Sequence, residues 1–339
     1  MEIRSCALEG LEKLTKPFTW KEVRVFVTGA AGFVGGWLVR ALRENLANVV
    51  VLIHNSDPQS DLFRSGMISQ VKVVNGRLED FGVLEQAINE NEIEVVLHLG
   101  AQTLVRAAHR TPLATLEANI RGTANLLEAC RLHSDVVQRV VVASSDKAYG
   151  EALELPYTED MPLHGRHPYE VSKSCADLIA QMYHHTYGVP VCIVRCGNIY
   201  GGGDLNWSRI VPGTIRSLSR GERPIIRSDG QYVRDYIYVE DVVNGYIQLA
   251  KQMDDPGVCG QAFNFGNESK MTVMDMVQAI QRTMGTDLEP IILDSAPGEL
   301  RSQYLSAARA RQKLGWAPQF SLEAGLKRTV DWYANFLAG

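Results

Sequence analysis

Short apolar runs alternate with helical patterns along the first two thirds of the chain. Six runs rich in valine, isoleucine and leucine predict strands at residues 23–27, 48–53, 71–75, 94–100, 138–145 and 190–201. Between them, apolar residues recur every three or four positions and predict helices at residues 36–46, 83–91, 115–133 and 169–188. Because strands that alternate with helices form parallel βαβ units, the pattern predicts an α/β fold with a doubly wound parallel sheet.

The pattern changes beyond Tyr200, where stretches rich in glycine and interrupted by proline predict the start of a smaller lobe. Strand-then-helix periodicity returns at 232–250, and amphipathic helices are predicted at 272–285 and 321–337. We therefore expect a discontinuous division of the chain. The first domain is predicted to span residues 1–198 and to regain 232–266, and the smaller C-terminal substrate lobe to span 199–231 and 267–339.

A glycine-rich turn follows the first predicted strand and opens an apolar-periodic helix. Its glycines have GxxGxxG spacing between Thr28 and Gly35. Gly29 permits a sharp turn, Gly32 lets the backbone approach a pyrophosphate, and Gly35 lets the helix pack closely on the sheet. The helix N-terminus then faces the phosphates. Such turns also occur for structural reasons, but the strand before and the helix after favour a Rossmann-type dinucleotide site with contacts from Gly29, Gly32, Phe33, Val34 and Gly35.

The identity of the dinucleotide stays open between NAD and NADP. The carboxylate that usually binds the adenine ribose is missing where the second strand ends, and His54 and Asn55 stand there instead. Asp57 is close enough in sequence to reach the ribose hydroxyls, which favours NAD. His54, Asn55 and Ser56 would also tolerate a 2′-phosphate, although no arginine lies between this strand and Arg64.

Further cofactor contacts are predicted where the next strands end. Leu99 and Ala101 close the strand at 94–100, Leu78 follows the strand at 71–75, and Asn119 lies in the helix at 115–133. Ligands of open parallel sheets bind outside these carboxyl ends. His98, in the same region, is interpreted as a core histidine.

Tyr169 and Lys173 stand four residues apart at the start of a predicted helix, so their side chains share one face. An ammonium beside a phenol favours the phenolate and lowers its pKa, which suits Tyr169 to act as a base on a substrate hydroxyl. Lys173 is also expected to bind the cofactor ribose. The alternative interpretation is two surface residues on a helix.

Ser145, Asp146 and Lys147 follow the strand at 138–145, at the edge where ligands of a parallel sheet bind. Ser145 is predicted to hydrogen-bond a substrate hydroxyl. Asp146 and Lys147 supply an acid and a base whose titrations are coupled. The alternative for this pair is a solvated ion pair in a turn.

These motifs resemble the extended short-chain dehydrogenase/reductases, the group of nucleotide-sugar epimerases and dehydratases, from about Val23 to the C-terminus. Thr28 to Gly35, Ser145, Tyr169 and Lys173 match its cofactor and catalytic motifs. The sub-family most resembled is CDP-glucose 4,6-dehydratase, in four segments: 18–20, 145–147, 195–204 and 209–212. Ser145 departs from the threonine usual in dehydratases, and Ala30-Ala31 from a His-Thr type of turn.

The resemblance implies a nucleotide-sugar 4,6-dehydratase that works through transient oxidation at C4 by NAD. In that scheme Tyr169 takes the C4 hydroxyl proton, Lys147 takes the C5 proton, and Asp146 protonates the departing C6 hydroxyl. Protonation of Asp146 at neutral pH requires burial to outweigh Lys147. The resemblance assigns the first domain to NAD(P) and the smaller lobe to the nucleotide-diphosphate sugar, with substrate contacts from Asn198, Arg209, Arg234 and Arg301.

Two other functions remain open at this point. An NAD-dependent nucleotide-sugar epimerase needs the same serine, tyrosine and lysine but no acid at C6, so the Asp146–Lys147 pair counts against it. A non-catalytic NAD(P)-sensing protein would not need Ser145, Tyr169 and Lys173 together. The resemblance also implies a homodimer formed by helices near residues 103–130 and 169–186. For each arginine above, a surface salt bridge is the alternative.

Composition excludes several other classes. The formal net charge of −5 argues against a general binder of nucleic acid or of membrane surfaces. The six cysteines contain no CxxC pair, and no apolar stretch approaches the ~20 residues of a membrane span, so we expect no disulfides and a cytoplasmic enzyme. His184-His185 and residues 164–167 lack acidic or cysteine partners at ligand spacing, so no metal site is expected.

Overall fold

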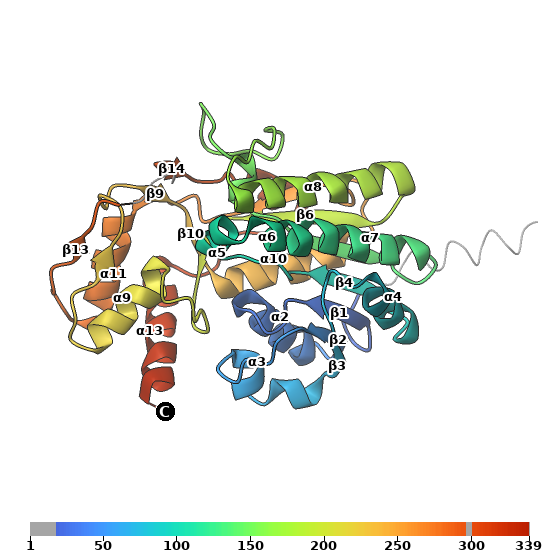
Figure 1. The fold of residues 1–339 in the computed structure, drawn as a ribbon, viewed down its shortest axis with the longest axis horizontal. Helices are drawn as coiled ribbons and strands as arrows, with labels where there is room; N and C mark the ends of the chain where they lie inside the picture. Colours follow the sequence, from blue (N-terminus) through green and yellow to red (C-terminus); the bar gives the residue numbers. More distant parts are fainter. Residues whose placement is uncertain (1–17, 296–299, 339) are drawn as a thin grey trace, which may run out of the picture.

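A sheet of seven parallel strands forms the centre of the protein in a computed structural model, which describes residues 18–295 and 300–338 (Figure 1). The strand order is β11-β6-β5-β4-β1-β2-β3. Their bounds are β1 Arg24–Thr28, β2 Asn48–Ile53, β3 Lys72–Asn75, β4 Val95–His98, β5 Arg139–Ala143, β6 Val191–Cys196 and β11 Ala262–Phe265. From the neighbouring strands β1 and β4 the sheet grows in both directions, through β2 and β3 on one side and through β5, β6 and β11 on the other. This is the doubly wound topology, so the predicted fold class is confirmed.

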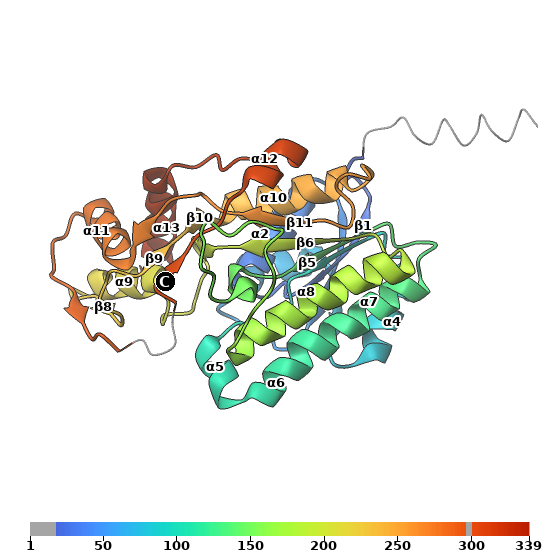
Figure 2. The same cartoon turned by 90° about the horizontal axis from the view of Figure 1, so that it is seen from above.

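Helices cover both faces of this sheet. Figure 2 shows α4 (Phe81–Glu90), α7 (Gly122–Leu132) and α8 (Pro168–Tyr187) on one face and α10 (Val239–Gln252) on the other, where α2 (Phe33–Glu44) packs against α10. Because both faces are covered, most successive residues of the inner strands are apolar. Val25 and Val27 enter one core cluster and Phe26 enters the other.

The rest of the chain forms small sheets and helices beside the carboxyl ends of the central strands (Figure 1). Three strands pair in the order β12 (Met271–Thr272), β9 (Val233–Arg234) and β14 (Ser302–Gln303). Two parallel pairs join β7 (Asn198–Tyr200) to β10 (Tyr236–Tyr238) and β8 (Ile225–Ile226) to β13 (Ile291–Ile292). The helices are α9 (Ile210–Ser219), α11 (Val273–Met284), α12 (Ala308–Leu314) and α13 (Leu322–Ala338).

The predicted return of the chain to the central sheet corresponds to α10 and β11, which pairs with β6. The exact division into two lobes stays a prediction. The predicted helix at 115–133 is α6 (Pro112–Leu116), a π-helical turn (Glu117–Arg121) and α7 in succession. The short helices α3 (Asp61–Arg64) and α5 (Val105–Arg110) complete the first part of the chain.

The described residues can be checked for disulfides, metal-binding groups and membrane-spanning helices. The five described cysteines are free, and Cys6 lies outside the described residues. Within 18–295 and 300–338, no group of histidine, cysteine and acidic residues could hold a metal ion. No described helix is both long and apolar enough to cross a membrane. Trp316 is buried and its indole N–H donates to the Asp241 carbonyl.

Asp235 lies between β9 and β10 and is 1% exposed. Its carboxylate accepts hydrogen bonds from the backbone N–H groups of Asn267 (3.1 Å) and Glu268 (3.3 Å), just beyond β11. Burial nevertheless raises the pKa of this carboxyl to about 6, because desolvation outweighs those hydrogen bonds. The folded chain therefore holds the proton more tightly than the unfolded chain does.

We expect this proton to appear in the pH dependence of stability. A carboxyl whose pKa rises on folding stabilises the protein fully below its unfolded pKa of 3.8, and that contribution is lost as pH rises through about 6. Relative to Asp235→Asn, the wild type should lose on the order of 3 kcal/mol of unfolding free energy across this range. Urea unfolding of both proteins at several pH values measures the difference.

Asp275 supplies a control of opposite sign. The Thr272 hydroxyl in its capping box lowers the pKa of the Asp275 carboxyl, so its contribution is present at neutral pH and is lost on acidification. If Asp235→Asn and Asp275→Asn change the pH profile in the same direction, burial is not the cause at Asp235.

Candidate active site

The turn between β1 and α2 can be built only with glycine at two positions. Gly29 has a φ of +74°, and a Cβ there would lie 2.7 Å from the backbone nitrogen of Gly100. A Cβ on Gly35 would overlap the Gly29 carbonyl oxygen, so the helix packs directly on the turn. Gly32 is different, since a Cβ there would approach only the Gly29 oxygen among the described residues, at 3.1 Å. This side of the turn has room for a ligand.

The first turn of α2 fits a pyrophosphate. Gly32 is its N-cap, no side chain caps it within the described residues, and no acidic residue lies in its first turn. Its free N–H groups and the positive end of the helix dipole together favour an anion. Phe33 and Val34 begin this helix, as predicted for the cofactor site.

The predicted contacts from β4 meet the same turn. The Leu99 N–H donates to the Thr28 carbonyl (3.2 Å), which fixes the end of β4 beside the end of β1. Leu78 packs against Gly100 and Gly122. Ala101 follows Gly100, whereas Asn55 lies two residues beyond β2 and is exposed. The structure thus brings Leu78, Leu99 and Ala101 to the glycine turn and places Asn55 at the neighbouring strand end.

Asn119 connects this region to α8. Its side-chain oxygen accepts from the Gln102 N–H (2.7 Å), and its amide donates to the Gln102 carbonyl (3.1 Å) and the Ser172 hydroxyl (2.9 Å). Ser172 in turn donates to the Tyr169 carbonyl (2.7 Å). Both amide hydrogens of Asn119 are therefore bonded to protein, and the side chain holds the loop and α8 together. The cofactor contact of Asn119 stays a prediction.

His98 is a core histidine, as interpreted. Its ring nitrogens bond the hydroxyls of Thr28 (2.7 Å) and Thr123 (3.0 Å). Burial, with a smaller contribution from the nearby Lys173 ammonium, lowers the pKa of His98 to about 3. The ring is therefore neutral and structural.

Ser145 follows β5, and the 3₁₀ turn η3 (Asp146–Tyr149) begins directly after it. The Ser145 hydroxyl donates to the Asp146 carboxyl (3.0 Å) and accepts from the Lys147 N–H (3.2 Å). Asp146 is buried, which excludes the alternative of a solvated ion pair in a turn. The hydroxyl and the carboxyl thus face one another at the carboxyl end of the sheet.

Burial raises the pKa of the Asp146 carboxyl. Lys147, the Ser145 hydroxyl and Arg234 all act in the opposite direction, and desolvation outweighs them. The direction is the one that a general acid requires at neutral pH, as expected from the sequence.

Tyr169 and Lys173 are both buried near this cluster. Burial raises the pKa of the Tyr169 phenol to about 12, while Arg209 and a hydrogen bond with Ser145 lower it. The Lys173 ammonium donates to the Ala143 carbonyl at the end of β5 (2.7 Å), and burial lowers the pKa of this lysine to about 8. The alternative interpretation, in which both residues lie on the protein surface, is therefore excluded.

One sequence-based expectation about the pair is wrong for this structure. Lys173 was expected to lower the pKa of Tyr169, but the phenol pKa is raised and Arg209 is the cation that opposes the rise. The reason is that the Lys173 ammonium binds a backbone carbonyl instead of the phenol. Spacing along a helix predicts a shared face and does not predict the acceptor.

The predicted substrate contacts differ in how they are held. Arg234 on β9 is buried, donates to the carbonyls of Val233 and Arg301, and acts electrostatically on Asp146. Arg209 caps α9, forms an ion pair with Asp204 (3.0 Å) and acts on Tyr169. The Arg301 side chain is 81% exposed and lies 3.5 Å from Asp229, as in the surface alternative.

Asn198 begins β7, where its backbone N–H donates to the Asp235 carbonyl (2.8 Å). This strand follows directly from β6, so Asn198 lies at the carboxyl end of the central sheet with Ser145. The substrate roles of all four residues stay predictions.

Two groups near the site were missed from the sequence. Gln303 on β14 accepts a hydrogen bond from the Lys147 ammonium (3.1 Å). Arg195 and Asp177 form a buried bidentate ion pair at 2.8 and 2.9 Å, and Arg195 also donates to the Tyr149 hydroxyl (2.9 Å). A buried arginine on an apolar strand was a signal for the second group, because such a charge needs a partner.

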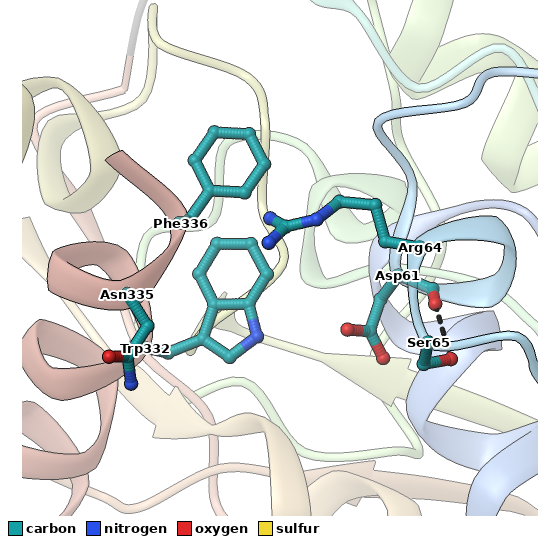
Figure 3. Close-up of a pocket in the computed structure, with 6 residues that line it drawn as sticks. All are labelled: Asp61, Arg64, Ser65, Trp332, Asn335 and Phe336. Carbon is teal, nitrogen blue, oxygen red and sulfur yellow. Dashed lines mark hydrogen bonds between the residues drawn. The ribbon is translucent and has the colours of Figure 1, made fainter. Parts of the chain in front are cut away.

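A separate pocket lies between α3 and α13 (Figure 3). The Arg64 guanidinium extends from α3 toward the rings of Trp332 and Phe336 and lies 4.4 Å from the Phe336 centroid. None of the predicted cofactor or substrate residues lines this pocket.

Comparison with known proteins identifies the family. The family model described as GDP-mannose 4,6 dehydratase matches residues 26–329. The chain belongs to this family. The predicted resemblance to extended short-chain dehydrogenase/reductases is thereby confirmed.

Both dehydratases and epimerases are similar to this member of the family. CDP-glucose 4,6-dehydratase of Salmonella typhimurium is 31% identical over 94% of this chain and 93% of that protein. UDP-glucose 4-epimerase of Mycolicibacterium smegmatis is 32% identical over 92% and 99%. Sequence identity therefore does not separate the two reactions.

Solved structures of an epimerase and of a dehydratase are also similar to this chain. UDP-glucose 4-epimerase of Thermotoga maritima with UDP-glucose has a TM-score of 0.85 and 30% identity, and covers 93% of this chain and 100% of its own. dTDP-glucose 4,6-dehydratase of Streptomyces venezuelae with NAD and TYD has a TM-score of 0.82 and 27% identity, and covers 92% and 97%.

Proposed function

We propose that the protein is a nucleotide-sugar 4,6-dehydratase, which converts an NDP-hexose with a CDP-glucose-like structure to an NDP-4-keto-6-deoxyhexose. The observation that carries this proposal is the acid–base pair behind Ser145. Asp146 is buried with a raised pKa and hydrogen-bonds Ser145, and Lys147 is the next residue. Elimination of water needs an acid at C6 and a base at C5 in addition to the base at C4, whereas epimerisation at C4 needs only the last of these.

NAD is the cofactor that we assign. The uncapped first turn of α2 and the open side of Gly32 suit its pyrophosphate. Solved relatives carry bound NAD, including the Streptomyces venezuelae dehydratase. When bound, NAD supplies a hydride acceptor and a positive charge.

Tyr169 acts on the C4 hydroxyl in this scheme. Its phenolate would accept the hydroxyl proton, the Ser145 hydroxyl would turn from Asp146 to donate to the sugar, and the C4 hydride would leave to the bound hydride acceptor, so that C4 becomes a ketone. Burial keeps the free phenol protonated, since it raises the pKa to about 12. Bound positive charge is therefore needed to activate Tyr169, which couples activation of the base to occupancy of the site.

Asp146 and Lys147 then carry out the elimination. The Lys147 ammonium would first give a proton to water, and the resulting amine would accept the C5 proton. The C6–O bond breaks, and Asp146 gives its proton to the leaving hydroxyl, which departs as water. A C5–C6 double bond forms in this step. Hydride returned to C6 and a proton returned to C5 give the 4-keto-6-deoxy sugar, and Asp146 regains a proton from water. No external oxidant is consumed.

Cations and amides near the cluster suit the diphosphate of the substrate. Arg234 lies close enough to Asp146 to affect its pKa, and Arg209 does the same for Tyr169. A diphosphate held by these side chains would place the sugar at the carboxyl end of β5. Asn198 offers a further hydrogen bond, and Arg301 one from the rim.

A 4-epimerase is the second candidate, because epimerases are as similar in sequence as dehydratases. Ser145, Tyr169 and Lys173 would suffice for it. A sensing protein without activity has no need of the buried Asp146. The dehydratase explains more of the site.

We further propose a homodimer. Large apolar side chains are exposed on the helices at 103–130 and 169–186 and just beyond them. They are Leu104, Val105, Leu113, Leu132, Leu178, Met182 and Tyr187. A second copy would cover this face, as the resemblance implies.

The proposed reaction is tested by incubating the purified protein with a panel of NDP-hexoses, CDP-glucose included, and analysing products by mass spectrometry. Loss of one water from a nucleotide sugar is the expected result. A new nucleotide sugar of unchanged mass would instead show that the protein is an epimerase. If nucleotide sugars bind but none is converted, neither enzymatic proposal holds and the non-catalytic sensing function is the one that remains.

A further inference from the structure

Gln303 occupies an unusual position beside the acid–base pair. It lies on β14, directly opposite Arg234 of β9 in the parallel register, and it is 1% exposed. Its side-chain oxygen accepts a hydrogen bond from the Lys147 ammonium at 3.1 Å. The two residues are separated by 156 positions in the chain, so the docking of β14 creates this contact.

The orientation of the Gln303 amide follows from its partner. An ammonium only donates hydrogen bonds, so the oxygen of Gln303 must face Lys147 and the amide nitrogen must point elsewhere. That nitrogen is buried and has no close hydrogen-bond partner among the described residues, although a hydrogen bond with Gln303 lowers the pKa of the Tyr157 phenol. Buried amide groups in proteins are nearly always well bonded, so one without a close acceptor at a reaction site indicates room for a ligand oxygen.

The surroundings define the chemistry of that partner. Lys147 and Arg234 both act on the buried carboxyl of Asp146, so Gln303 belongs to the same small cluster. Arg234 and Lys147 contribute donors only. An oxygen-rich ligand, such as a sugar with its diphosphate, is the partner that such a set of donors binds.

We propose that Gln303 is a positioning residue for Lys147: its side-chain oxygen holds the Lys147 nitrogen where it can reach C5, and its amide nitrogen donates to an oxygen of the bound nucleotide sugar. This inference rests on the proposed function. It deepens that function by adding a residue of the smaller lobe to the acid–base pair of the larger one. Substrate that engages the amide would therefore also fix the base.

Gln303→Met tests the role, because methionine has a similar length and neither accepts nor donates in this way. We expect dehydration to slow on the order of ten- to a hundredfold, as for a misplaced catalytic group. Oxidation at C4 should continue, so the 4-keto-hexose that has lost two hydrogens should build up in the mass spectrum to at most one equivalent per bound NAD. KM should rise because the amide donor is also gone.

The double variant with Lys147→Met separates positioning from a general structural defect. If Gln303 acts through Lys147, then Lys147→Met and the double variant dehydrate at the same residual rate. Gln281→Met is the matched control. Gln281 is another buried glutamine, on α11, and its amide donates to the Leu288 carbonyl. It should leave the ratio of dehydration to C4 oxidation unchanged.

Three results would overturn the inference. They are unchanged dehydration by Gln303→Met, equal loss of both steps, and losses that multiply in the double variant. An unchanged KM would show that the Gln303 amide does not donate a hydrogen bond to the substrate. Full dehydration by Lys147→Met would instead overturn the proposed base itself, and Gln303 with it, so the two failures are distinguishable.

Discussion

Tyr169→Phe is expected to lower the rate of dehydration by roughly 10²- to 10⁴-fold, the usual contribution of a positioned acid–base group. In the proposed scheme the substitution removes the oxygen that accepts the C4 hydroxyl proton, and it leaves the ring in its buried position. Because C4 oxidation comes first, the 4-keto-hexose should not accumulate. Product mass and the binding of nucleotide sugar, followed separately, measure the effect.

Tyr183→Phe is a matched control on the same helix. Its phenol also has a pKa raised by burial to about 12, but its hydroxyl donates to Glu128, on α7. We expect activity close to that of the wild type. A Tyr169→Phe enzyme within twofold of the wild type would show that another group takes the C4 proton.

The central sheet was predictable because its signals are local. Most of its strands are short apolar runs buried on both faces, and helices with their own periodicity alternate with them. The glycine turn is equally local, since Gly29 and Gly35 are required by backbone contacts within a few residues and with the end of β4. The smaller lobe was harder, because its strands of two or three residues carry no detectable alternation.

The candidate site was predictable to the level of residue types and not of contacts. Ser145, Asp146, Lys147 and Tyr169 converge because strand ends and the start of α8 meet at one edge of the sheet. The acceptor of Lys173 and the partner of Lys147 depended on distant chain segments. No sequence pattern near Lys147 points to Gln303, since β14 reaches it only through the register with β9.

Burial has opposite consequences for the titrating groups of this site. It raises the pKa of Asp146 and of Tyr169, and it lowers that of Lys173 to about 8. For Asp146 the result is an acid that keeps its proton, which elimination requires. For Tyr169 the same effect opposes function, so activation of the phenol has to come with the ligands. The dry environment thus prepares the second step and makes the first one dependent on binding.

Asp146→Asn should separate the two steps of the reaction. A carboxyl that is protonated in the working state and an amide are both neutral, and the amide oxygen can still accept from Ser145, so the cluster should keep its structure. The amide cannot give a proton to the C6 hydroxyl. We expect dehydration to fall by roughly 10²- to 10⁴-fold while C4 oxidation continues.

The measurement is made in deuterium oxide with the CDP-hexose or other NDP-hexose found to be turned over. Wild-type product should lose one water and carry one deuterium at C5, whereas Asp146→Asn should accumulate the 4-keto-hexose that has lost two hydrogens. Unaltered dehydration by this variant would mean that another group protonates the leaving hydroxyl. Loss of both steps would mean that Asp146 is needed for oxidation as well, and the buried pair would then no longer distinguish a dehydratase from an epimerase.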